Sequence, residues 1–190
     1  MFDLRRPSSR AWLEIVMGDL DSFLVDHAAC ERKASALGMS FVVRYPDRHA
    51  MLDDLIAFSR EELEHFHVMY RVLRDRGLVF ANDYRDEYVG ALRRLVRTGR
   101  EERLLDMLVV AGLVEARGCE RMGLVRDTLP DGELQRVYEE LTRAEARHHG
   151  LFFRLARLYF SEAAIRERSS FLLDQEAEII DALPLLPRLH

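Results

Sequence analysis

The sequence predicts an all-α protein, a four-helix bundle with a long middle connection and an additional C-terminal helix. Apolar residues recur at three- and four-residue steps along most of the chain, and no segment alternates as a strand does. Glycine (10) and proline (5) are sparse among the 190 residues, which favours long uninterrupted helices. A Glu-x-x-His pattern occurs twice, from Glu62 to His65 and from Glu145 to His148, and this spacing is typical of metal-binding helical bundles.

The first half of the bundle is predicted to be two helices joined by a proline-containing turn. The first helix runs from about Leu13 or Asp19 to Val43. It ends at Tyr45-Pro46-Asp47 because the residue before a proline is pushed out of the helical conformation. The second covers roughly His49 to Arg76, and Gly77 is predicted to be its C-terminal cap.

The second half repeats this plan after a connection over residues 78–99, which holds a short amphipathic helix predicted from Asp83 to Val96. A third helix of about Glu101–Thr128, a turn at Leu129–Gly132 and a fourth helix of about Glu133–Phe160 follow. A last helix is expected over about 161–182, with residues 184–190 as a tail. We expect one domain over residues 1–190, with its core bundle at about 13–160.

Composition indicates a soluble, cytoplasmic protein. The chain is 48% hydrophobic and 32% charged, which fits a globular protein with a real core. Its two cysteines imply no disulfide framework, and no apolar run is long enough to span a bilayer. The net charge of -5 argues weakly against a general polyanion binder.

A lone glutamate on a helical stripe precedes each Glu-x-x-His pattern. Glu31 lies 31 residues before Glu62, and Glu115 lies 30 residues before Glu145. Glu31 and Glu62 are 15 residues before and 16 after the first turn proline, and the second pair is 15 residues on either side of Pro130. At a rise of about 1.5 Å per residue in antiparallel hairpins, these offsets predict that all four carboxylates lie in one layer.

This arrangement predicts a carboxylate-bridged dinuclear metal site. A carboxylate on an apolar helical stripe is costly to bury unless it is paired or bound to metal. Each histidine follows its glutamate by three residues, so both side chains leave one face of the helix. Oxygen donors with a few imidazoles suit iron or manganese better than zinc. The predicted ligands are Glu31, Glu62, His65, Glu115, Glu145 and His148.

Other glutamates compete for these roles. Glu61 and Glu64 lie about 100° and 200° around the helix from Glu62, which places them on a solvated face. Glu120 is the rival of Glu115, since Cys119-Glu120-Arg121 echoes the residues around Glu31. Glu120 lies five residues after Glu115, which places it about 140° around the helix and off the apolar line. Glu115 is therefore preferred.

Four further residues lie near these positions. His27, one turn before Glu31, faces the same side and is either a partner of that ligand or a core histidine. His149 lies off the apolar stripe and is expected to be exposed. Cys30 and Cys119 are expected to be packing residues.

Four segments carry a family resemblance: Asp26–Ala34, Arg60–Phe66, Val114–Arg121 and Glu145–His149. Together they resemble the tRNA 2-methylthio-N6-isopentenyladenosine hydroxylase family of ferritin-like non-haem di-iron monooxygenases, over essentially the whole chain. Ferritin-like proteins in general share the Glu-x-x-His pairs, whereas the Asp-His-x-x-Cys-Glu and Glu-Ala-Arg-x-Cys-Glu-Arg strings point to this family.

The resemblance implies O2-dependent hydroxylation of the isopentenyl group on a hypermodified adenosine of the tRNA anticodon loop. Its cofactors would be two iron ions held by the six predicted ligands, with electrons from a separate reductase. The base would have to leave its stack to reach the metals, and the arginines between Arg93 and Arg103 are the candidate phosphate contacts. A cluster of this kind is more often a solvated face, and 27 of the 28 basic residues are arginine throughout the chain.

Two rivals stay open: an iron-handling ferroxidase, and a di-metal oxidase of a small molecule. A storage ferritin needs a shell and does not explain the middle connection or the last helix. A monomer or small oligomer without membrane attachment is expected.

Overall fold

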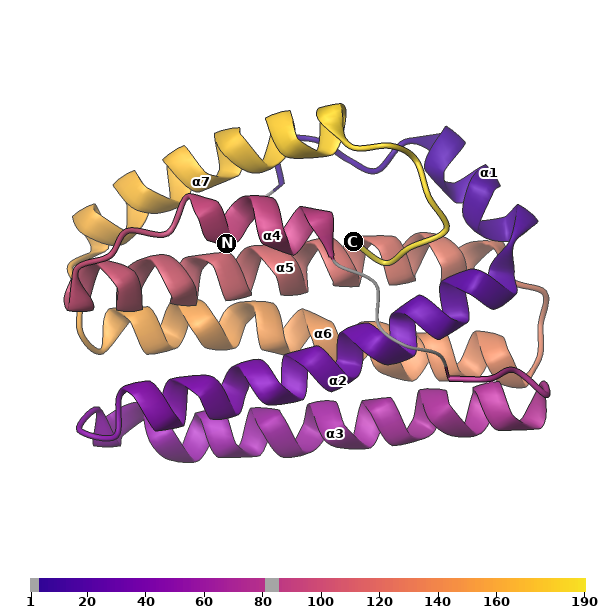
Figure 1. The fold of residues 1–190 in the computed structure, drawn as a ribbon, viewed down its shortest axis with the longest axis horizontal. Coiled ribbons are helices and arrows are strands. Elements are labelled where there is room, and N and C mark those ends of the chain that lie inside the picture. The colour runs from indigo at the N-terminus through magenta and orange to yellow at the C-terminus, as the bar shows by residue number, and fades with distance from the viewer. Residues whose placement is uncertain (1–3, 81–85) are drawn as a thin grey trace. The chain divides into compact units, whose positions relative to one another are not determined.

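A computed structural model describes residues 4–80 and 86–190 of the chain (Figure 1). Those residues form helices and contain no strand, so the all-α prediction is confirmed. They divide into two compact units. The α2–α3 unit comprises the described residues of 14–80 and 186–189, and the α5–α6 unit comprises those of 4–13, 86–185 and 190. No helix among the described residues has the length and apolar character needed to cross a membrane.

In the α2–α3 unit, two long helices lie side by side as a hairpin (Figure 1). The short helix α1 (Arg10–Gly18) precedes α2 (Leu20–Arg44) in the chain, and only its residues from 14 onward belong to this unit. Asp19 is the N-cap of α2 and accepts a hydrogen bond from the Ser22 amide. α2 ends directly before the predicted turn, which continues as the 3-10 helix η1 (His49–Met51) and α3 (Leu52–Asp75).

Two glycines in this hairpin have roles that other residues would fill poorly. Gly77 has a φ of 72° after α3, and the Leu78 amide donates to the Leu73 carbonyl at 2.8 Å. This closes the helix as a Schellman motif, as predicted for a glycine cap. Gly38 lets α2 approach α3, since a Cβ there would lie 2.8 Å from the Phe58 ring.

In the α5–α6 unit, α5 (Arg100–Thr128) and α6 (Glu133–Arg157) form the second hairpin, while α4 (Glu87–Arg94) and α7 (Glu162–Ala182) pack on α5 and on each other (Figure 1). Residues 83–85 of the predicted middle helix lie outside the described residues. α6 ends three residues earlier than predicted, and Ser161 caps α7 by accepting from the Ala164 amide.

Residues 184–190 follow the last helix as the expected tail, and the end of this tail is packed. Leu189 is buried, and its amide donates to Asp26 in the α2–α3 unit at 2.9 Å. In the α5–α6 unit, the His190 ring stacks on Tyr88 with 5.4 Å between ring centres. Pro184 lies two residues after the end of α7 and cannot continue the helix.

Candidate metal centre

The α2–α3 unit brings together the three ligands predicted from the first half of the sequence. Glu31 on α2 and Glu62 and His65 on α3 are all buried. His65 Nδ1 lies 3.6 Å from Glu31 Oε2 and 3.7 Å from Glu62 Oε1. The near-equal offsets of Glu31 and Glu62 from the turn therefore place the two helices in register, as predicted.

The α5–α6 unit contains a matching set. Glu115 on α5 and Glu145 and His148 on α6 are also buried. His148 Nδ1 lies 3.8 Å from Glu115 Oε2 and 3.4 Å from Glu145 Oε2. In both units the same ring atom, Nδ1, faces two carboxylates that come from different helices.

The chemistry and spacing of each set fit a bound metal ion. Atoms that bind one ion at about 2.1 Å lie roughly 3 Å or more from each other. The nitrogen–oxygen separations of 3.4 to 3.8 Å are close to that value and longer than an ordinary hydrogen bond. Two carboxylates and one imidazole per unit are donors that suit iron or manganese.

Glu120, the rival of Glu115, has a different role. Its side-chain oxygens accept hydrogen bonds from the Ser8 amide at 2.6 Å and the Ser8 hydroxyl at 2.7 Å. Arg117 also donates to Glu120 at 3.0 Å. Glu120 therefore anchors the N-terminal segment to α5, while Glu115 lies beside His148.

The remaining candidates on the ligand helices divide between solvent and core. Glu64 is exposed as expected, and Glu61 is half-buried. The expectation that His149 is exposed was wrong: the side chain is buried, and Nδ1 lies 2.9 Å from the Gly112 carbonyl oxygen. Gly112 makes this possible because the absence of a side chain lets α6 come close to α5.

The two cysteines are packing residues at the edges of the sets. Cys30 is buried beside Glu31. Burial and the negative charge of Glu145 raise the pKa of the Cys119 thiol, which donates weakly to the Thr142 carbonyl at 3.6 Å. A thiol with a raised pKa is a poor metal ligand at neutral pH, since the thiolate is the binding form.

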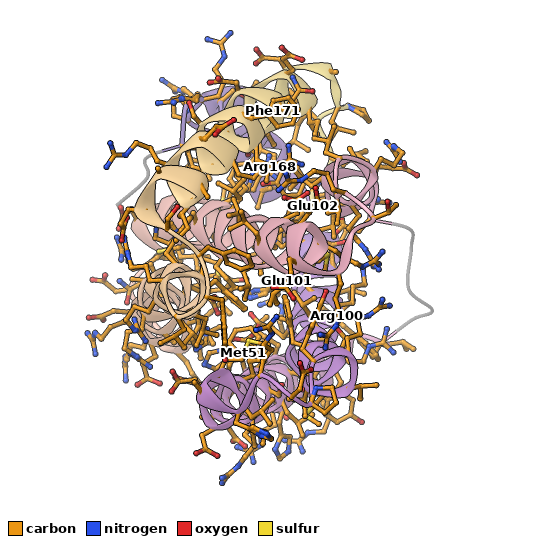
Figure 2. The ribbon with its side chains drawn as sticks, turned by 90° about the vertical axis from the view of Figure 1, so that its left-hand side faces the viewer. Met51, Arg100, Glu101, Glu102, Arg168 and Phe171 are labelled. Carbon is orange, nitrogen blue, oxygen red and sulfur yellow. The ribbon has the colours of Figure 1, made fainter. Side chains whose placement is uncertain are left out.

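The arginine-rich connection is held by a buried carboxylate that sequence analysis did not single out. Asp106 on α5 is fully buried and accepts from the Arg97 amide at 2.8 Å, from the Arg97 guanidinium at 2.7 Å and from Arg168 at 2.7 Å. Arg168 also donates to the Leu95 carbonyl at 2.7 Å. Figure 2 shows Arg168 extending from α7 toward the start of α5, with Phe171 beside it.

A second buried network fixes α4, α5 and α7 together. Arg117 is fully buried and donates to Glu176 on α7 at 2.8 Å and to the Arg6 carbonyl at 2.7 Å. Tyr88 on α4 donates to the same Glu176 oxygen at 3.0 Å. Burial, followed by the charge of Glu176, raises the pKa of Tyr88 well above its ordinary value. Arg117 belongs to the Glu-Ala-Arg-x-Cys-Glu-Arg string that resembles the family, whereas no motif in the sequence marks Tyr88 or Glu176.

Comparisons with known proteins agree with this geometry. A family model described as tRNA-(MS[2]IO[6]A)-hydroxylase (MiaE) matches residues 2–190. A Pseudomonas putida protein named tRNA 2-(methylsulfanyl)-N(6)-isopentenyladenosine(37) hydroxylase is 34% identical over 184 residues, covering 97% of this chain and 89% of the relative. A Salmonella typhimurium protein of the same name is 31% identical over 130 residues, covering 68% of this chain and 47% of that relative.

A solved structure is also similar to the chain. It is described as protein 43 with aldehyde deformylating oxygenase activity from Synechococcus. The TM-score is 0.95 at 34% identity, and the match covers 100% of this chain and 96% of that chain. This similarity confirms the predicted ferritin-like fold class.

Proposed function

Because the chain belongs to the tRNA-(ms2io6A)-hydroxylase (MiaE) family, we propose that it hydroxylates the isopentenyl group of 2-methylthio-N6-isopentenyladenosine in tRNA. One observation carries the proposal: each unit of a chain that matches this family from residue 2 to 190 holds a buried glutamate opposite a buried Glu-x-x-His pair. The reaction consumes O2, two electrons and two protons, and it yields the alcohol and water. The electrons come from an external reductase.

The six predicted residues would hold two iron ions in one ferritin-like domain. Their four carboxylates match the four positive charges of two ferrous ions, which offsets the cost of burying them. Nδ1 of His65 and of His148 would supply the two nitrogen ligands, since these atoms face the carboxylates in each unit. When bound, the iron pair would supply the O2 chemistry that an allylic C–H bond requires.

The substrate is a base in the anticodon loop, so the protein must also bind RNA backbone. Arg93 and Arg94 at the end of α4 and Arg100 at the start of α5 are exposed, and arginine matches phosphate geometry. Arg97 is tied to Asp106, which fixes the backbone between these arginines. We expect the protein to act in the cytoplasm as a monomer or small oligomer.

A small-molecule oxygenase is the second candidate, and the Synechococcus structure favours it specifically. That protein is described as having aldehyde deformylating oxygenase activity, and its similarity covers the whole chain. The two candidates differ in their need for RNA. Only the tRNA reaction should therefore respond to substitutions in exposed arginines.

The first experiment measures metal content and product together. Protein expressed with iron should contain close to two irons per chain, and Glu62→Ala combined with Glu145→Ala should remove them. Glu64→Ala is the matched control, because this exposed glutamate lies on the same helix and should leave the metal in place. Reduced protein, O2 and prenylated tRNA should then give a nucleoside heavier by one oxygen atom.

The second experiment separates the two candidates. Activity on whole tRNA should fall with salt more steeply than activity on the free nucleoside, because only tRNA binding releases counterions. Arg93→Ala with Arg94→Ala should lower this salt slope by about one unit per lost phosphate contact, whereas Arg143→Ala on α6 should not. A chain that converts an aldehyde and leaves prenylated tRNA unchanged would move the function to the second candidate.

A further inference from the structure

The two ligand sets are matched in their metal-facing atoms but differ one turn before the first glutamate. In the α2–α3 unit this position is His27, four residues before Glu31. In the α5–α6 unit the corresponding position, four residues before Glu115, is Ala111. A methyl group can neither donate nor accept a hydrogen bond.

His27 contacts the glutamate oxygen that does not face His65. His27 Nε2 lies 2.6 Å from Glu31 Oε1, whereas His65 Nδ1 is near the other oxygen, Oε2, at 3.6 Å. A carboxylate can only accept, so Nε2 is the donor in this short contact. Glu31 is thereby held through one oxygen, while the other oxygen lies near His65.

The histidine ring is itself fixed by packing. His27 is fully buried, and the Phe23 ring, one turn earlier on α2, lies 6.1 Å from it between ring centres. A spacing of four residues places His27 and Glu31 on one face of the helix. The contact therefore belongs to α2 alone and does not depend on the α5–α6 unit.

From this difference we infer that the two metal positions are inequivalent, with His27 as a positioning residue that fixes Glu31 as a one-oxygen ligand on the α2–α3 side. This inference rests on the proposed function, since it assumes that the six ligands bind metal. A ligand held in its binding orientation loses less freedom when the ion arrives, and partners of this kind typically change metal affinity by about 10- to 100-fold. The α2–α3 position of the native chain should therefore bind a first metal ion more tightly than the same position in a chain without His27.

The test titrates Co²⁺ alone, by its visible absorption and by competition with a chelator, into variants with one set disabled. In a His148→Ala background only the α2–α3 set keeps its histidine, and adding His27→Leu should lower Co²⁺ affinity by about 10- to 100-fold. In a His65→Ala background the same change should alter affinity by less than about threefold. Circular dichroism verifies that each variant folds.

Two amide variants separate the positioning role of His27 from its role in packing. They also keep the inference testable if the His27→Leu variant does not fold. His27→Gln has an amide nitrogen that can reach Glu31 and should restore the affinity in the His148→Ala background. His27→Asn is too short to reach it and should not. Equal losses in both backgrounds, or no loss with leucine or asparagine, would overturn the inference while leaving metal binding established. Failure of the unmodified chain to bind Co²⁺ would instead remove the proposed function together with the inference.

Discussion

Replacing Asp106 with alanine should destabilise the α5–α6 unit strongly. This carboxylate is fully buried and is the common acceptor for Arg97 and Arg168. The substitution leaves both guanidinium groups without their shared counter-charge. Removing one partner of a buried ion pair typically costs about 3–5 kcal/mol, because the remaining charge stays in a poorly solvated place.

The two arginines should contribute unequally to this cost. The Arg97 side chain is 41% exposed and can recover much of its hydration by turning to solvent. The Arg168 side chain is 14% exposed and packs over the Phe171 ring, so it has less access to water. We therefore expect the lower end of the range, about 3 kcal/mol, which corresponds to a fall in Tm of about 6–12 °C for a chain of this size.

The effect should also depend on pH in a defined direction. Burial raises the pKa of Asp106, but hydrogen bonds from Arg97 and then Arg168 outweigh it and leave the pKa below its usual value. A carboxyl with a lowered folded-state pKa contributes stability above its unfolded pKa of about 3.9 and loses that contribution as pH falls through the folded value. The difference in free energy of unfolding between the native chain and the Asp106→Ala variant should thus have its full size at pH 7 and decrease below about pH 4.

The assay is urea unfolding followed by circular dichroism at several pH values. Glu139→Ala is the matched control, because Glu139 and Arg143 form an exposed pair four residues apart on α6, and such pairs are worth about 0.3–0.5 kcal/mol. Two results would refute the ion-pair reasoning. One is a loss of unfolding free energy in Asp106→Ala no larger than that in Glu139→Ala, and the other is a large loss that stays constant down to pH 2.

Two further predictions concern α5. Glu115→Ala should abolish metal binding, whereas Glu120→Ala should leave the metal in place and loosen the N-terminal segment, which limited proteolysis would detect; metal loss only in the Glu120 variant would reverse the ligand assignment. Gly112→Ala should cost about 1–3 kcal/mol, because its Cβ would lie 2.8 Å from the Phe153 ring, and unchanged unfolding would show that the helices separate freely there.

Local spacing was enough to predict which glutamates and histidines lie together in each unit. Helix period and the offsets from Pro46 and Pro130 depend only on backbone geometry, so they placed Glu31 beside His65 and Glu115 beside His148 before any tertiary contact was known. The turn after α2 and the glycine cap after α3 were predictable for the same reason, since proline and glycine act through their own backbone.

Long-range contacts decided the features that sequence analysis missed or misjudged. His149 is buried because Gly112, 37 residues away, lets the helices approach closely. Asp106 looks like an ordinary acidic residue until α7 brings Arg168 to it, 62 residues along the chain. Periodicity shows which side of a helix is apolar, but the partner that makes a buried charge tolerable comes from another helix. The sequence by itself therefore determined the helices and which glutamates and histidines come together within each unit, and the tertiary structure decided which of the other polar residues are buried.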